Sequence, residues 1–391
     1  MPTYLLAFSV SDFTALVHPE DETYKLWARN GLAQTQGHYA NNLAPQIIQD
    51  TWQLEQQFVY QEMHSVLLTD ALNSTHPMNT VVDSPASASA AFDNIAYNKG
   101  GCIIRYMEYF LGDEIFRNGL NKYLTRREFK PAVPDDLWTA MHDAIPDPPS
   151  ILPEDMTFND VMKPWDLLPG YPVVTVTRDY TTKSAHITQK RFVTQGEPGD
   201  ETWNIALSYT TQANPDFENL DFYWLTDAEE PNFSLPAELG NDHWLLFNVK
   251  EVGYYRVNYD KKNWELLSGA QLSLHPINRA QVMDDALALA RVSLVEYPTA
   301  LDTTEYLSQE TEYVPWGAGL TATSYIWDHV HAEQDGIDLR RGERLHSDGR
   351  RLAHHEPEAL ARAQVGVRVR TPGVQHRGHQ ALPGVDKHHR S

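Results

Sequence analysis

The stretch AFDNIAYNKGGCIIRYMEYFLG, residues 91–112, has the apolar spacing of one long amphipathic helix, yet two adjacent glycines stand in its middle. Each glycine in a helix interior costs about 1 kcal/mol relative to alanine. Gly100 and Gly101 follow directly after Tyr97, Asn98 and Lys99. We therefore interpret the sequence of this helix as constrained by something other than helix stability.

The composition of the chain is that of a globular protein. Its 391 residues are 41% hydrophobic and 11% aromatic, which is enough for two or three domains with a sizeable core. The formal net charge of −22 leaves no basic surface for phosphates, so we expect no nucleic-acid partner. The single cysteine, Cys102, excludes an internal disulfide and is predicted to be a small core residue.

Targeting signals are absent from the sequence as it stands. No run of 18 apolar residues occurs, so no transmembrane segment is predicted. The first residues, MPTYLLAFSVSDF, lack the basic flank and cleavage site of a signal peptide, and their alternation indicates a β-strand. The localisation therefore stays open.

The apolar period changes twice along the chain. Residues 14–165 are helix-rich, as in TWQLEQQFVYQEMHSVLLTDAL (51–72). Residues 166–260 hold short alternating runs separated by turn clusters such as QGEPGDE and DAEEPNFS, which predicts an antiparallel β-sandwich. The helical period then returns over 261–326, where Asn278 and Gln281 resemble a capping pair. Residues 327–391 are rich in arginine and histidine, and after Trp327 they contain no aromatic residue, which predicts disorder.

The residues by themselves give no self-sufficient active site. A helical zinc site needs two histidines one turn apart, and His-x-x-x-His does not occur in the chain. One cysteine cannot build a thiolate zinc site, and neither a Gly-x-Ser-x-Gly elbow nor a phosphate-binding glycine loop is present. We therefore predict no metal ligands.

Several segments resemble, in order, the aminopeptidase N (membrane alanyl aminopeptidase) family of gluzincin zinc metallopeptidases. IAYNKGG, running into IIRYM and FLG, resembles the family's tyrosine helix. The other matching segments are TYLLAFSVSDF, Thr75-His76-Pro77, GYPVVTVTR, GYYRVNYD, INRAQVMDDALALAR and YLSQETEYVPW. Together they cover residues 3–326.

The resemblance implies an α+β multidomain fold and assigns a role to each part. Residues 1–13 would be the last strand of an N-terminal β-domain and 14–165 an incomplete thermolysin-like catalytic domain. Residues 166–260 would be the β-sandwich, 261–326 the start of a C-terminal helical domain, and 327–391 a tail foreign to the family. The family uses one zinc ion to release N-terminal residues from peptides, often at the extracellular face of the plasma membrane. In the family's reaction, Tyr97 would stabilise the oxyanion of the transition state.

Two segments of the family pattern are absent from this sequence. Neither Gly-x-Met-Glu-Asn, which binds the substrate's amino terminus, nor His-Glu-x-x-His with its following Asn-Glu occurs, and the flanking helices meet at Asp50. We therefore expect no retained zinc, no definable substrate-binding residues and no peptide hydrolysis. Without the missing helices, the apolar faces of residues 52–72 and 92–111 are expected to be exposed. The alternatives are a non-catalytic binding or decoy form that associates with a full-length homologue, or a mis-predicted gene product.

Overall fold

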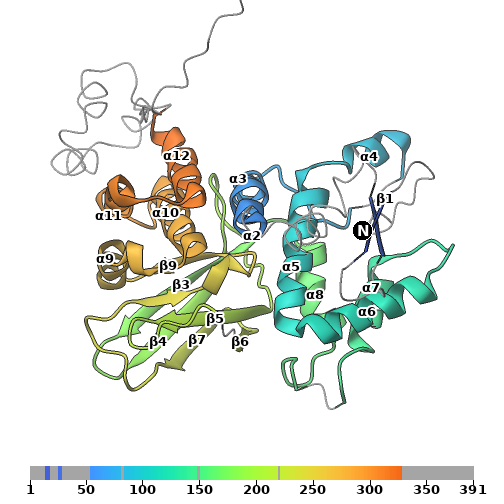
Figure 1. Cartoon of the computed structure of the whole chain (residues 1–391), viewed down its shortest axis with the longest axis horizontal. Helices are drawn as coiled ribbons and strands as arrows, with labels where there is room; N and C mark the ends of the chain where they lie inside the picture. Colours follow the sequence, from blue (N-terminus) through green and yellow to red (C-terminus); the bar gives the residue numbers. More distant parts are fainter. Residues whose placement is uncertain are drawn as a thin grey trace, which may run out of the picture.

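The computed structural model describes residues 14–17, 25–28, 53–80, 83–147, 150–218 and 221–327. Within these residues a helical part is followed by two β-sheets and then by a second helical part (Figure 1). The predicted α+β multidomain layout is therefore confirmed. The strand expected over 1–13, the junction at Asp50 and the tail from residue 328 onward lie outside the described residues.

The first part is helical, with one short pair of strands before it. Strands β1 (Thr14–Val17) and β2 (Lys25–Ala28) pair antiparallel, with Leu16 opposite Leu26, inside a region expected to be helix-rich. The helices are α2 (Leu54–Phe58), α3 (His64–Asp70), α4 (Pro85–Ala90), α5 (Gly100–Leu111), α6 (Asp113–Arg126), α7 (Pro134–His142) and α8 (Phe158–Leu167). Two single turns of π-helix, η3 (Val59–Met63) and η4 (Ile95–Lys99), interrupt the run from α2 to α3 and precede α5.

The middle part consists of two sheets, as the alternating runs predicted. One has the strand order β7-β4-β3-β9 and the other β6-β5-β8. Their strands are β3 (Pro172–Asp179), β4 (Ser184–Arg191), β5 (Ile205–Thr211), β6 (Phe222–Leu225), β7 (Glu229–Ser234), β8 (Leu245–Phe247) and β9 (Arg256–Tyr259). All pairs are antiparallel except β3 with β9, where the last strand returns parallel to the first, with Val174 opposite Val257.

Strand β7 lies where the sequence predicted a turn cluster, DAEEPNFS. Pro231 lowers the strand tendency of this segment because it cannot donate a backbone hydrogen bond. In the structure β7 is an edge strand, and it pairs with β4 only. Proline is tolerated at a sheet edge, since one side of the strand needs no hydrogen bonds.

The last described part is again helical. It contains α9 (Lys261–Gly269), α10 (Pro276–Arg291), α11 (Tyr297–Asp302) and α12 (Tyr313–Trp327), with short 3₁₀ turns η6 (Gln271–Ser273) and η7 (Glu305–Gln309). The capping pair predicted at Asn278 and Gln281 is wrong. His275 caps α10 by accepting a hydrogen bond from the Ile277 amide, whereas Asn278 is fully buried inside the helix.

Helices α2 and α3 lie in the centre of the molecule, between α5 on one side and α10 and α12 on the other (Figure 1). The predicted exposure of the apolar faces of 52–72 and 92–111 is wrong for most of their side chains. Phe58, Val66 and Tyr106 are buried, while Leu68, Leu72 and Phe92 remain exposed. One hydrophobic core runs from Phe58 to Ile326 through all three parts.

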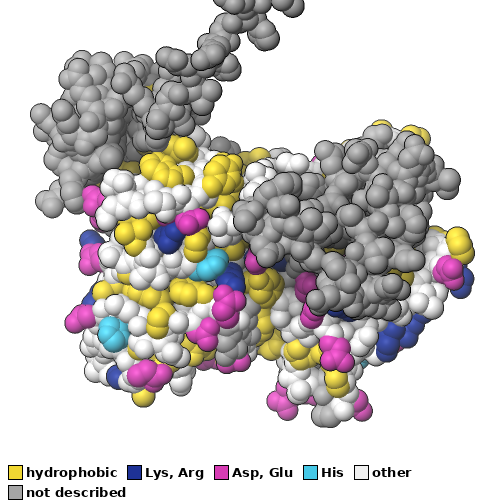
Figure 2. Space-filling view, viewed as in Figure 1, with side chains coloured by type: hydrophobic (Ala, Val, Ile, Leu, Met, Phe, Trp, Pro, Cys, Tyr) yellow, Lys and Arg dark blue, Asp and Glu magenta, His cyan; other side chains and the backbone are white. Residues whose placement is uncertain are grey.

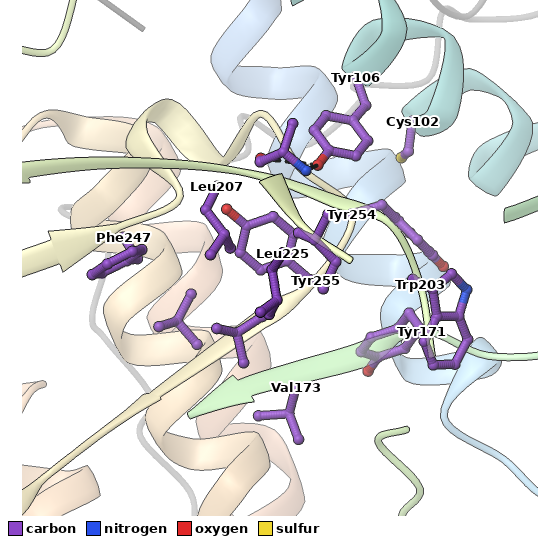
Figure 3. Packing of buried hydrophobic residues seen from close by; sticks show 14 of the residues in the cluster. Cys102, Tyr106, Tyr171, Val173, Trp203, Leu207, Leu225, Phe247, Tyr254 and Tyr255 are labelled. Atoms are coloured by element: carbon purple, nitrogen blue, oxygen red, sulfur yellow. Dashed lines mark hydrogen bonds between the residues drawn. The ribbon is translucent and has the colours of Figure 1, made fainter. Parts of the chain in front are cut away.

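Figure 3 shows how helix α5, through Tyr106, is bonded to strand β5. The Tyr106 hydroxyl accepts a hydrogen bond from the Ala206 amide at 2.6 Å and donates one to the Ala206 carbonyl at 2.9 Å. Cys102 is buried beside it, as predicted for a core residue, and burial raises the pKa of its thiol. Residues 100 positions apart are thus joined within one core.

The described surface shows acidic side chains over both the sheets and the helices (Figure 2). This distribution is consistent with the net charge of −22. Among the described residues, no helix has the length and apolar character needed to cross a membrane.

Candidate functional site

The helix that bears Tyr97 begins beside a pair formed by His76 and Asp93. The Asp93 side chain accepts a hydrogen bond from the Ala96 amide at 3.0 Å, which caps the start of η4. His76 lies 2.6 Å from the other Asp93 oxygen through Nε2 and 2.8 Å from the Pro77 carbonyl through Nδ1. Partial burial opposes protonation of His76, but these two hydrogen bonds outweigh it and raise its pKa. The Thr75-His76-Pro77 turn therefore fixes where the tyrosine helix starts.

Tyr97 lies in the middle of the π-turn η4 and is half-buried. Its amide donates to the Asp93 carbonyl at 3.1 Å, and its ring centroid is 6.3 Å from that of Phe92. A π-turn inserts one extra residue into a helix and occurs frequently at functional sites. The periodicity of the sequence predicted a continuous helix and gave no sign of this turn.

Gly100 and Gly101 are both buried, but close packing does not explain Gly100. A Cβ atom built at Gly100 meets no described atom within 4 Å outside the backbone of its own helix. A close approach of the helix to its described neighbours is therefore not the constraint at Gly100. Gly100 lowers the stability of the helix, and the described residues give no steric reason for a glycine at this position.

We expect Gly100→Ala to raise the free energy of unfolding by about 0.5–1 kcal/mol, because the helix gains an alanine and no described side chain opposes the new methyl group. Urea unfolding measures the change. Gly119→Ala in α6 is the matched control: its Cβ would lie 3.1 Å from the Met141 Cα, so the helix gain is cancelled or reversed. If Gly100→Ala lowered the free energy of unfolding, the space that the structure leaves around this Cβ position would be filled in the folded protein.

Lys99, next in the motif, forms a fully buried ion pair. Its Nζ lies 2.9 Å from Asp70 Oδ2 and donates to the Gly170 carbonyl at 2.8 Å. Asp70 also accepts hydrogen bonds from Thr75, the Gly170 amide and Tyr254. Burial lowers the pKa of Lys99, although Asp70 opposes the shift. The pair connects the end of η4 to the end of α3 and to the segment that precedes β3.

A second buried cluster joins the first helical part to the last. His64 of α3 lies 2.8 Å from Glu251, which follows β8. Nearby, Arg256 Nη1 lies 2.6 Å from Asp284 and 2.9 Å from Asp285 of α10. No local pattern in the sequence predicted this cluster. The only signal was the adjacent acidic pair within an otherwise apolar helix, as in MDDALALA.

No metal centre assembles from the described residues. Among them, no group of three His, Cys, Asp or Glu side chains could hold a metal ion. The six described histidines each bond within the fold, through Glu251 for His64, Asp93 and Pro77 for His76, Phe158 for His142, Glu229 for His186, Gly240 for His243 and Ile277 for His275. Because no three such side chains converge among the described residues, those residues do not fit a zinc ion. His18, His38 and the tail histidines lie outside the described residues.

Comparison with known proteins defines the class to which this fold belongs. The model of the peptidase family M1 domain matches residues 22–165, and that of the ERAP1-like C-terminal domain matches residues 244–344. Aminopeptidase N of Oryctolagus cuniculus is 35% identical over 317 residues, which is 77% of this chain and 31% of that protein. Aminopeptidase Ey of Gallus gallus is 33% identical over 315 residues, 77% of this chain and 31% of its own length.

Aminopeptidase N of Plutella xylostella is 33% identical over 317 residues, 79% of this chain and 33% of that protein. The chain belongs to the aminopeptidase N family of M1 peptidases. It spans about a third of the length of these relatives.

Proposed function

We propose that this chain is an aminopeptidase-N-family polypeptide that does not itself release N-terminal residues from peptides. The observation that carries the proposal is the absence of His-x-x-x-His, and of Gly-x-Met-Glu-Asn, from all 391 residues. The lack of a converging group of three His, Cys, Asp or Glu side chains among the described residues supports it. The M1 family is generally zinc-dependent, so a chain without these segments lacks the family's metal ligands and its general base.

The chemistry explains why the tyrosine helix is insufficient. Zinc lowers the pKa of bound water from 15.7 to about 7 and polarises the carbonyl, and a general base contributes roughly 10²–10⁴-fold. Tyr97 remains the proposed oxyanion donor of the family's reaction. A hydroxyl in this position can donate to a developing oxyanion, but it supplies neither a nucleophile nor a base. Tyr97 alone therefore cannot start peptide hydrolysis.

The test is the zinc content of the purified chain together with hydrolysis of an alanine anilide. We expect less than about one zinc in ten chains and no turnover, and Tyr97→Phe should change neither result. Rabbit aminopeptidase N in the same assay is the positive control. One tightly bound zinc per chain with turnover that falls about 10²–10³-fold in Tyr97→Phe would contradict the proposal.

Thermal unfolding of the same sample distinguishes the alternatives. A non-catalytic binding or decoy form must fold, and the hydrophobic core that extends from Phe58 to Ile326 supports one cooperative transition. A broad, non-cooperative melt would favour a mis-predicted gene product. The domain limits at residues 165, 260 and 326, association with a full-length homologue, and the lack of a nucleic-acid partner remain predictions.

A further inference from the structure

The turn that follows β8 holds unusual backbone conformations. Asn248, Lys250 and Glu251 have φ values of 62°, 51° and 48°, in the left-handed region. Asparagine tolerates this region, but for other L-residues it costs roughly 1–2 kcal/mol each. Strain of this kind persists only where the surrounding structure holds it in place. This turn, residues 248–253, is therefore maintained by its contacts.

Two helices supply backbone contacts to the turn. Arg105 of α5 donates to the Glu251 carbonyl at 2.6 Å and to the Lys250 carbonyl at 3.0 Å. Asn278 of α10 accepts from the Lys250 amide at 2.9 Å and donates to the Asn248 carbonyl at 3.0 Å. The turn thus lies between a helix of the first part and a helix of the last.

The third contact is an ion pair with α3. His64 and Glu251 lie 2.8 Å apart, and their side chains are only 3% and 1% exposed. The charged groups that act on His64 are Glu251 from the turn, Asp284 from α10 and Arg256 from β9. Burial and Arg256 oppose protonation of His64, but the two carboxylates outweigh them and raise its pKa to about 9.

Loss of the His64 proton would leave the turn with an uncompensated charge. The proton that leaves is on Nδ1, which has no hydrogen-bond partner among the described residues, so the neutral ring can still donate from Nε2 to Glu251. It no longer neutralises that carboxylate, however, and a buried charge without a counter-charge is strongly destabilising. A strained backbone segment is the part of the structure that such a penalty would displace first.

We propose that residues 248–253 form a latch between α3 and α10, closed while His64 is protonated and opened when His64 loses its proton. The latch is a conformational device of the fold, and it does not depend on whether the chain hydrolyses peptides. Because the native pKa of His64 is raised, the stabilisation is complete below about pH 6.5 and is lost as the pH rises through about 9.

Hydrogen exchange of the amides of residues 249–253 tests the latch. After correction for the intrinsic exchange rate, we expect the opening equilibrium constant to rise about tenfold per pH unit between pH 7.5 and 9 and then to level off. Below pH 7.5 the measurement is less specific, since burial raises the pKa of Asp285 to about 7. An opening constant that stays flat between pH 7.5 and 9 in the unmodified chain would overturn the proposal.

Variants assign the effect to His64. His64→Gln should abolish the rise, whereas His186→Gln should leave it unchanged, because His186 pairs with Glu229 at the exposed surface. If His64→Gln fails to fold, Glu251→Gln gives a second test: without the Glu251 charge the midpoint should fall by more than one pH unit. The proposal would also be overturned if the opening constant of His64→Gln rose with pH as in the unmodified chain. It would likewise be overturned if the pH midpoint of the rise were the same in Glu251→Gln as in the unmodified chain.

Discussion

Replacing Lys99 by methionine is expected to lower the free energy of unfolding by about 3–5 kcal/mol. The side chains of Lys99 and Asp70 are both 0% exposed, and their charged atoms lie 2.9 Å apart. Methionine fills a similar volume but leaves the Asp70 carboxylate without its cation. The hydrogen bonds from Thr75 and Tyr254 remain, yet they carry no compensating charge. Urea unfolding followed by circular dichroism measures the loss.

The matched control is Lys261→Met, because Lys261 is 69% exposed and lies 3.7 Å from Glu296. Exposed pairs of this kind contribute little, so its effect should stay within about 0.5 kcal/mol. Adding Asp70→Asn to Lys99→Met should restore part of the lost stability, since the unpaired charge is then removed. A loss below about 1 kcal/mol for Lys99→Met would show that the pair is not buried as the structure has it.

Local patterns in the sequence were sufficient to predict the order of the parts. The alternating runs between residues 166 and 260 predicted the sheets, since period two places every second side chain in the core. The 3.6 period around Tyr97 predicted its helix. Each of these patterns acts over a few neighbouring residues. The helix that bears Tyr97 was predictable for this reason, whereas the catalytic role of Tyr97 stays a prediction.

The buried charges were not predictable in the same way. Lysine is almost never fully buried without a partner, so nothing in YNKGG marked Lys99 as an interior residue. Its partner Asp70 lies in another helix, and Glu251 follows His64 by 187 residues. Such pairs depend on how the helices and sheets meet. The two π-turns and edge strand β7 were also missed, because the pattern of apolar residues marks neither one extra residue in a helix nor an edge strand that contains proline.

Replacing Arg256 by methionine should cost at least as much as the loss of Lys99, about 3–5 kcal/mol at pH 8, because one cation serves two carboxylates. Arg256 is 0% exposed and contacts both Asp284 and Asp285. Burial would raise the pKa of Asp284, but Arg256 and His64 outweigh it and lower that pKa. In the native chain, ionised Asp284 therefore stabilises the fold above its unfolded pKa near 3.8, and this contribution disappears as the pH falls through the lowered value.

Without Arg256, burial dominates and the carboxylates bind protons more readily in the folded state than in the unfolded one. The loss in the free energy of unfolding relative to the native chain should then be largest at pH 8 and become smaller towards pH 5, as the carboxylates become protonated. Urea unfolding at both pH values measures it. Arg117→Met, which removes an exposed pair with Asp113, is the control and should cost less than about 0.5 kcal/mol at either pH. A loss that is the same at pH 5 and pH 8 would mean that lost packing, rather than two unpaired charges, destabilises the variant.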